Sequence, residues 1–250
     1  MRTAALPQPT RRTAWPRFRG RQRFLVYSQP RSASSSFVSL LNAHPEVWCD
    51  TEVLADTWSN DGLAWRREHG FSRNKDVVRR LPAYLRAYWS SAFCRRPICG
   101  FKVFHRHLRW LPPSANVSWL LAGAPSGAVK VIVLERRNVS AAYASWQRAL
   151  ASGNWGATPH AQQDINRTAG FRNLARMNAT SFEQYAMQHR VWFRLAHELV
   201  PSPPLLHVWA EDLTGSNQSL LSTASRVLHF LGANDGASTS DAYASAFARG

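Results

Sequence analysis

An alternation of short apolar segments with segments of helical periodicity constrains the fold of this chain more than any other feature. Four apolar segments have the length of strands, and they cover residues 24–27 (FLVY), 98–104 (ICGFKVF), 128–134 (AVKVIVL) and 205–209 (LLHVW). Segments this short and apolar are typical of strands buried on both faces of a parallel sheet. Helical patterns separate them, at residues 37–42, 60–92, 139–151, 181–199 and 220–231. The sequence therefore predicts a three-layer α/β/α fold with a central parallel sheet.

Several details of this prediction concern boundaries. Lys102 interrupts the apolar run at 98–104, and Pro82 predicts a break or a new helix start inside residues 60–92. The chain leaves the first helix at Pro45, and Gly232 is expected to end the last helix. Two further segments have weaker patterns, and we expect helix and turn at 108–121 and a polar loop at 153–177.

The first residues differ in composition from the rest of the chain. Residues 1–23 contain seven Arg, three Pro and no acidic residue, and they lack the apolar centre of a secretory signal. We expect residues 1–22 to form a basic, disordered arm and residues 23–250 to form a single domain. No run of eighteen apolar residues occurs, so a transmembrane helix is not expected.

The net charge is strongly positive, with 31 Lys and Arg against 15 Asp and Glu, which gives +16 at pH 7. Such a chain attracts anions, among them nucleic acids, acidic glycans and phosphorylated small molecules, although an Arg-favouring codon bias would also raise the charge. The arginines are scattered, and no helix-turn-helix, RRM or zinc-finger signature is present, which disfavours a nucleic-acid partner. The three cysteines lack metal-ligand spacing, and Cys94 could pair with Cys99 in an oxidising compartment.

The segment QPRSASSS, residues 29–36, joins the first strand to the first helix. A helix N-terminus that follows a parallel strand binds anions through its free N–H groups and its positive dipole end. Small residues allow an anion to approach the backbone, hydroxyl groups add donors, and Arg31 adds a planar positive charge. Serine is also a favoured N-cap, so capping is the alternative interpretation. The segment is not a Walker A loop, because no Gly-Lys-Ser/Thr follows.

A similar arrangement follows the strongest predicted strand, where VIVLERRN places two arginines at the strand end. Ser145 lies eight or nine residues further on, within the predicted helix, and two helical turns can bring it near the same anion. A solvated basic turn would explain Arg136 and Arg137 taken alone. Two anion sites at one edge of a sheet instead predict a ligand that carries two separated phosphates.

These segments resemble the sulfotransferase superfamily that uses PAPS (3′-phosphoadenosine 5′-phosphosulfate), in particular its carbohydrate-type and bacterial Stf-like branches. YSQPRSASSSFVSLLNAHPEV resembles the family loop R-[ST]-G-[ST]-[ST] with its helix and His-Pro exit. VIVLERRNVSAAYAS resembles the second family signature, a strand that ends in Arg and is followed about eight positions later by a helical Ser. Weaker similarities are GFKVF at 100–104, VWAEDL at 208–213 and RVLHFLGA at 226–233. Three features depart from the family: Ala33 stands where Gly is usual, the Asp-Pro of cytosolic members is missing, and no clear nucleotide loop follows Leu231.

The resemblance implies a P-loop-like sulfotransferase fold and a role for each matching residue. Arg31 with the following serines would hold the 5′-phosphosulfate, and either Arg136 or Arg137 would hold the 3′-phosphate together with Ser145. Glu52 matches the general base of carbohydrate members, with His44 and His105 as alternatives, and Lys102 would line the cleft. The expected cofactor-binding residues are Arg31, Ser32, Ala33, Ser34, Ser35, Ser36, Arg136, Arg137 and Ser145, and the expected catalytic residues are Arg31, Glu52 and Lys102.

The resemblance thus implies a PAPS-dependent sulfotransferase that releases PAP (adenosine 3′,5′-bisphosphate) and needs no metal. Its hydroxyl acceptor would be a small molecule or a glycan, and we expect an anionic carbohydrate. The alternatives are a basic nucleic-acid-binding protein and an inactive member that binds nucleotide or a sulfated partner. Five Asn-X-Ser/Thr sequons are compatible with the Golgi lumen. We expect the Golgi lumen or another organelle if the N-terminus is incomplete or is a transit segment, and otherwise the cytoplasm. A C-terminal truncation of the domain is also open.

Overall fold

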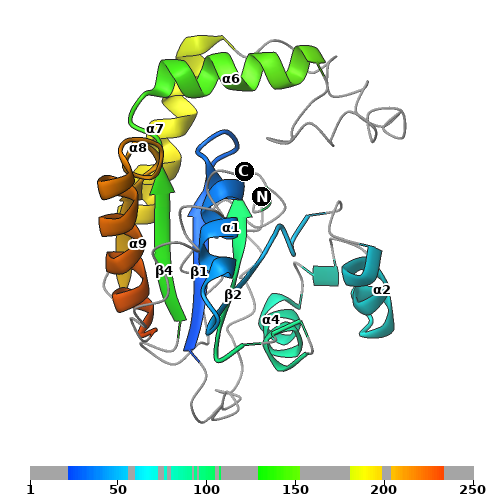
Figure 1. The fold of residues 1–250 in the computed structure, drawn as a ribbon. Coiled ribbons are helices and arrows are strands. Elements are labelled where there is room, and N and C mark those ends of the chain that lie inside the picture. Colours follow the sequence, from blue (N-terminus) through cyan, green and yellow to red (C-terminus); the bar gives the residue numbers. More distant parts are fainter. Residues whose placement is uncertain are drawn as a thin grey trace, which may run out of the picture.

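The computed structural model describes residues 22–55, 60–72, 76–77, 80–91, 93–94, 96–104, 107, 129–152, 181–198 and 204–233. Within these residues a sheet of five strands forms the centre of the molecule (Figure 1), and neighbouring strands are parallel throughout. The spatial order is β2-β3-β1-β4-β5. The strands are β1 (Gln22–Ser28), β2 (Val47–Asp50), β3 (Ile98–Phe104), β4 (Val129–Glu135) and β5 (Leu205–Trp209).

Helices cover both faces of this sheet. The helices that the structure describes are α1 (Ser34–Ala43), α2 (Asn60–Glu68), α4 (Leu81–Ser90), α6 (Val139–Ser152), α7 (Phe182–Glu198), α8 (Ala210–Thr214) and α9 (Asn217–Leu231). Because successive side chains of a strand point to opposite faces, Phe24 and Val26 of β1 pack with α1, α8 and α9, whereas Leu25 and Tyr27 pack with α2, α4 and α7. The predicted three-layer α/β/α fold is confirmed.

The pairing of the two central strands requires a glycine. Gly100 of β3 lies opposite Phe24 of β1, and a Cβ atom at this position would be 2.4 Å from the Phe24 carbonyl oxygen and 2.6 Å from its ring. A side chain at residue 100 would therefore push the strands apart. The same region contains a disulfide between Cys94 and Cys99, the pair that the sequence left open, and Cys49 is a free, buried thiol.

Most predicted elements are confirmed, with a few corrections. β2 was not predicted, and β3 runs without a break because the aliphatic stem of Lys102 is buried in it. The pattern at 60–92 forms two separate helices, α2 and α4, and Pro82 lies in the first turn of α4, where proline is tolerated. Of the expected arm at 1–22, only Gln22 is described, and it is the first residue of β1. The segments at 108–121 and 153–177 lie outside the described residues. No helix within the described residues is long and apolar enough to cross a membrane.

Candidate functional site at the carboxyl edge of the sheet

The parallel register brings the carboxyl ends of the strands to one edge of the sheet. Ser28 at the end of β1 pairs with Phe104 of β3 on one side and with Leu134 of β4 on the other. In Figure 1, α6 crosses beyond the tip of β4 at this edge. Ligands of open parallel sheets bind at such an edge. The predicted site residues lie on the loops after β1, β2 and β4, on the helices α1 and α6, and on β3.

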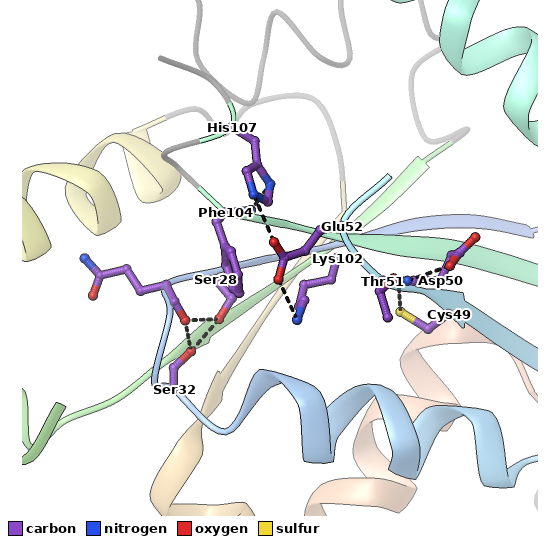
Figure 2. Close-up of polar contacts among 10 residues, drawn as sticks. Ser28, Ser32, Cys49, Asp50, Thr51, Glu52, Lys102, Phe104 and His107 are labelled. Atoms are coloured by element: carbon purple, nitrogen blue, oxygen red, sulfur yellow. Dashed lines mark hydrogen bonds and ion pairs between the residues drawn. The ribbon is translucent and has the colours of Figure 1, made fainter. Parts of the chain in front are cut away.

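Serine hydroxyl groups hold the loop after β1 in one shape. Ser32 Oγ lies 2.5 Å from Ser28 Oγ and donates to the Gln29 carbonyl oxygen at 2.6 Å (Figure 2). Both serines are buried. Ser32 therefore stabilises the loop from inside, and its hydroxyl is already engaged.

Two residues of this loop adopt left-handed backbone conformations, which are unusual for residues with a side chain. Arg31 has φ 71°, and Ala33 has φ 56° and ψ 22°. Ala33 stands where the family loop that the segment resembles has glycine, and glycine adopts this backbone conformation without strain. Strain of this kind is concentrated at functional loops.

The N-terminus of α1 lacks a side-chain cap. The N-cap residue is Ala33, and no side chain makes a capping hydrogen bond there, so the capping interpretation of the serines is wrong. The first helical hydrogen bond runs from the Phe37 N–H to the Ala33 carbonyl at 2.9 Å. The N–H groups of Ser34, Ser35 and Ser36 therefore have no acceptor within the helix, as expected for an anion-binding helix start.

The loop after β1 meets the helix after β4. Arg31 Nε donates to Ser145 Oγ at 2.9 Å, and the Arg136 guanidinium donates to the Arg31 carbonyl at 3.1 Å. Arg31 thus contacts both Ser145 and Arg136, which the sequence assigned to a second phosphate site. Burial lowers the pKa of Arg31, and the positive charges of Arg136 and Arg148 lower it further. A bound anion would relieve this repulsion between neighbouring arginines.

Arg136 and Arg137, which the sequence could not distinguish, point to different places. The Arg137 side chain is 54% exposed, lies 3.6 Å from Asp212, and stacks over the Trp209 ring at 4.7 Å. Of these two arginines, Arg136 is the one that contacts the loop containing Arg31 in the described part of the chain. The geometry therefore favours Arg136 as the residue that faces a ligand.

Glu52 lies between two basic side chains (Figure 2). Its carboxylate is 3.3 Å from Lys102 Nζ and 3.2 Å from His107 Nε2. Lys102 is 4% exposed and also lies over the Phe104 ring, at 4.7 Å from its centroid. His107 Nδ1 accepts a hydrogen bond from the Phe104 N–H, so the proton of the neutral ring is on Nε2, which faces Glu52. The carboxylate is thereby fixed from two sides.

The sequence analysis missed His107, which lies two residues after the suggested alternative base His105. His105 is outside the described residues. His44, the other alternative, is buried and accepts the Glu46 N–H on Nδ1, which is a structural role. His107 follows β3, the strand that carries Lys102, and this position in the sequence was a usable signal.

Two more polar side chains at this edge went unnoticed. Gln29 Nε2 and the Tyr185 hydroxyl are buried and have no hydrogen-bond partner in the part of the chain that the structure describes. Gln29 belongs to the loop after β1, and Tyr185 lies close enough to Arg136 and Arg31 for their charges to affect its pKa. Buried polar atoms without a partner are costly, and at this edge they fit an anionic ligand that supplies acceptor oxygens.

Comparisons with known proteins show a similarity to solved structures. No protein-family model matches the chain, and no curated protein matches it. Among solved structures, the chain is similar to a sulfotransferase domain from the olefin synthase of Synechococcus PCC 7002, with a TM-score of 0.42 and 14% sequence identity. The similarity covers 90% of this chain and 78% of that chain.

Proposed function

We propose that this chain transfers a sulfuryl group from PAPS to a hydroxyl group of an acceptor, which we take to be an anionic carbohydrate. The observation that carries the proposal is the contact of Arg31, from the loop after β1, with Ser145, on the helix after β4. It joins the two segments that the sequence assigns to the two phosphates of one nucleotide. The Glu52 carboxylate, at the same edge of the sheet, adds a base for the acceptor hydroxyl.

The site residues fit a ligand with two phosphate groups. The free N–H groups at the start of α1, together with Ser34, Ser35 and Ser36, suit the phosphate at the 5′ position. Arg136 and Ser145 suit the phosphate at the 3′ position, and Arg31 joins the two subsites. The buried Gln29 amide and Tyr185 hydroxyl supply donors that no described residue uses.

In this proposal each side chain has a distinct task in an in-line displacement. PAPS supplies the sulfuryl group when it is bound, and it leaves as PAP. Glu52 accepts the proton of the acceptor hydroxyl as the new O–S bond forms, which is general base catalysis. Lys102 and His107 hold the Glu52 carboxylate in place, because their nitrogen atoms lie 3.3 and 3.2 Å from its two oxygen atoms.

Arg31 stabilises the negative charge that develops on the leaving phosphate. Positioned donors of this kind lower the barrier of such a reaction by on the order of 3 kcal/mol. Burial and the charges of Arg136 and Arg148 lower the pKa of Arg31. The ordinary pKa of arginine is the highest of any side chain, so the guanidinium keeps its charge at neutral pH.

The experiment that tests this function is thermal unfolding with and without PAP, on the parent chain and on Arg136→Ala, with Arg137→Ala as the matched control. A ligand at 100 times its Kd stabilises a protein by about 2.7 kcal/mol, which for this length corresponds to a rise in Tm of roughly 5–10 °C. We expect this rise in the parent and in Arg137→Ala, and a much smaller one in Arg136→Ala. A folded parent whose Tm does not respond to PAP contradicts the proposal.

Transfer itself is then measured with PAPS and a panel of neutral and anionic saccharides, in the presence of EDTA. Sulfated product that forms in EDTA supports a metal-independent sulfotransferase. Binding of PAP without transfer to any acceptor would instead favour the inactive, nucleotide-binding alternative.

A further inference from the structure

One face of α7 is packed against the end of β4. Its buried residues Tyr185, His189 and Phe193 are spaced by four, so they share this face. His189 Nδ1 lies 3.8 Å from a carboxylate oxygen of Glu135, the last residue of β4. Phe193 meets the Tyr27 ring of β1, with 6.2 Å between the ring centroids. These contacts fix α7 where the candidate site begins.

Tyr185 is one helical turn before His189, and aromatic rings of α6 fix its orientation. The centroid of its ring is 5.4 Å from that of Tyr143 and 5.7 Å from that of Trp146. Such aromatic contacts restrict a ring to one orientation. Both partners belong to the helix that carries Ser145, so Tyr185 is tied to the same helix as this predicted phosphate ligand.

The hydroxyl group of Tyr185 is buried without a partner. The residue is only 6% exposed, and its oxygen has no hydrogen-bond partner in the described parts of the chain. Burial raises the pKa of Tyr185 to about 12, although the charges of Arg136 and Arg31 lower it. The Tyr185 hydroxyl group therefore keeps its proton at neutral pH. It can donate a hydrogen bond through this proton or accept one through its oxygen. Because the positive charges of Arg136 and Arg31 act on this hydroxyl group, the favoured partner is an anion.

We propose that Tyr185 determines the selectivity for a nucleotide that carries a 3′-phosphate, by donating a hydrogen bond to the same phosphate that Arg136 and Ser145 bind. This inference rests on the proposed function. A phosphate offers three terminal oxygens, which can accept from Arg136, Ser145 and Tyr185 together. A nucleotide with a 3′-hydroxyl lacks this negative charge, so its hydrogen bond with Tyr185 is weaker and the arginines stay uncompensated.

The test compares the binding of PAP and of adenosine 5′-phosphate by titration calorimetry, in the parent chain and in Tyr185→Phe. The substitution keeps the ring and its packing and removes only the hydroxyl group. We expect Tyr185→Phe to weaken PAP binding by about tenfold or more, the usual loss for a hydrogen bond to a charged group. The affinity for adenosine 5′-phosphate should stay within about twofold, so the ratio between the two ligands falls.

Tyr143→Phe is the matched control. Its ring packs in the same cluster, but its hydroxyl already accepts a hydrogen bond from Gln147 Nε2 at 2.9 Å. We expect PAP binding to be unchanged in this variant.

Three outcomes overturn the inference while the proposed function stands: unchanged PAP affinity in Tyr185→Phe, an equal loss for both nucleotides, or an equal loss of PAP affinity in Tyr143→Phe. A folded parent chain that binds PAP no better than adenosine 5′-phosphate also overturns it. A folded parent chain that binds neither nucleotide overturns the proposed function, and this inference with it.

Discussion

At the scale of single residues, the site depends on side chains that are held by their neighbours before any ligand is bound. Glu52 is fixed between Lys102 and His107, and Arg31 is fixed by Ser145. Such preorganisation reduces the cost of aligning groups during the reaction. A substitution that removes one of these side chains also leaves its neighbours without a contact. Nucleotide binding and turnover therefore have to be measured separately.

Glu52→Gln should lower kcat by 10²–10⁴-fold, because the amide cannot accept the proton of the acceptor hydroxyl. PAP affinity should stay within about threefold, since the nucleotide is proposed to contact other residues. Single-turnover transfer and calorimetry with PAP measure the two effects. Glu68→Gln, at an exposed position of α2, is the control and should leave both unchanged. Turnover at the parent rate in Glu52→Gln would remove Glu52 from the mechanism.

Ala33→Gly should stabilise the protein by about 1 kcal/mol. Residue 33 has φ 56°, a left-handed conformation that costs a residue with a Cβ atom about 1–2 kcal/mol, part of which is offset by the greater chain entropy of glycine. Urea unfolding measures the change. Ala43→Gly, in the last turn of α1, should destabilise the protein, because glycine is a poor helix former. A loss of stability in Ala33→Gly would show that the loop relaxes its strain in another way.

At the scale of elements, the position of α6 depends on a residue far away in the sequence. Glu211, in the first turn of α8, accepts hydrogen bonds from the N–H groups of Arg137 and Asn138 at 3.0 and 2.9 Å, just before α6 begins. A carboxylate at a helix N-terminus also interacts favourably with the helix dipole. The segment VWAEDL at 208–213 therefore holds the start of the helix that carries Ser145.

Glu211→Gln should destabilise the protein by about 1 kcal/mol at pH 7, the usual size of a capping interaction. Burial raises the pKa of Glu211, but the hydrogen bonds from Asn138 and Arg137 outweigh it and hold the pKa below its ordinary value. A lowered pKa contributes stability above the pKa of the unfolded chain, near 4.3, and this contribution is lost as the pH falls through the folded value. Urea unfolding at pH 7, 5 and 4 should show the difference from the parent narrowing only at the lowest pH. A difference that does not depend on pH would contradict an ionic role.

At the scale of the whole molecule, a formal charge of +16 attracts many anions, so anion binding alone does not identify the function. A buried site and a solvated basic surface differ in their response to salt. Between 50 and 200 mM salt we expect PAP affinity to fall by less than about tenfold, because buried groups are screened only weakly. Binding of a DNA duplex through surface arginines should fall by about 10³–10⁵-fold over the same range. DNA binding that exceeds PAP binding at 200 mM salt would favour the nucleic-acid alternative.

The sequence by itself determined the three-layer fold and the two segments that build the candidate site. Strand length, apolar runs and helical periodicity are local properties, so β1, β3, β4 and β5 and the helices α1, α6, α7 and α9 could be located without knowing any contact. β2 could not be located in this way, because VWCD is short and half of its side chains are only partly buried.

Only the tertiary structure decided which side chains meet. The separation of Arg136 from Arg137, the contact of His107 with Glu52, and the packing of Tyr185 against α6 each depend on the distance and angle between elements. No local pattern encodes these distances, because they result from how the sheet twists and how α6 and α7 pack against its edge. The sequence specifies which groups are available, and packing decides which of them share one site.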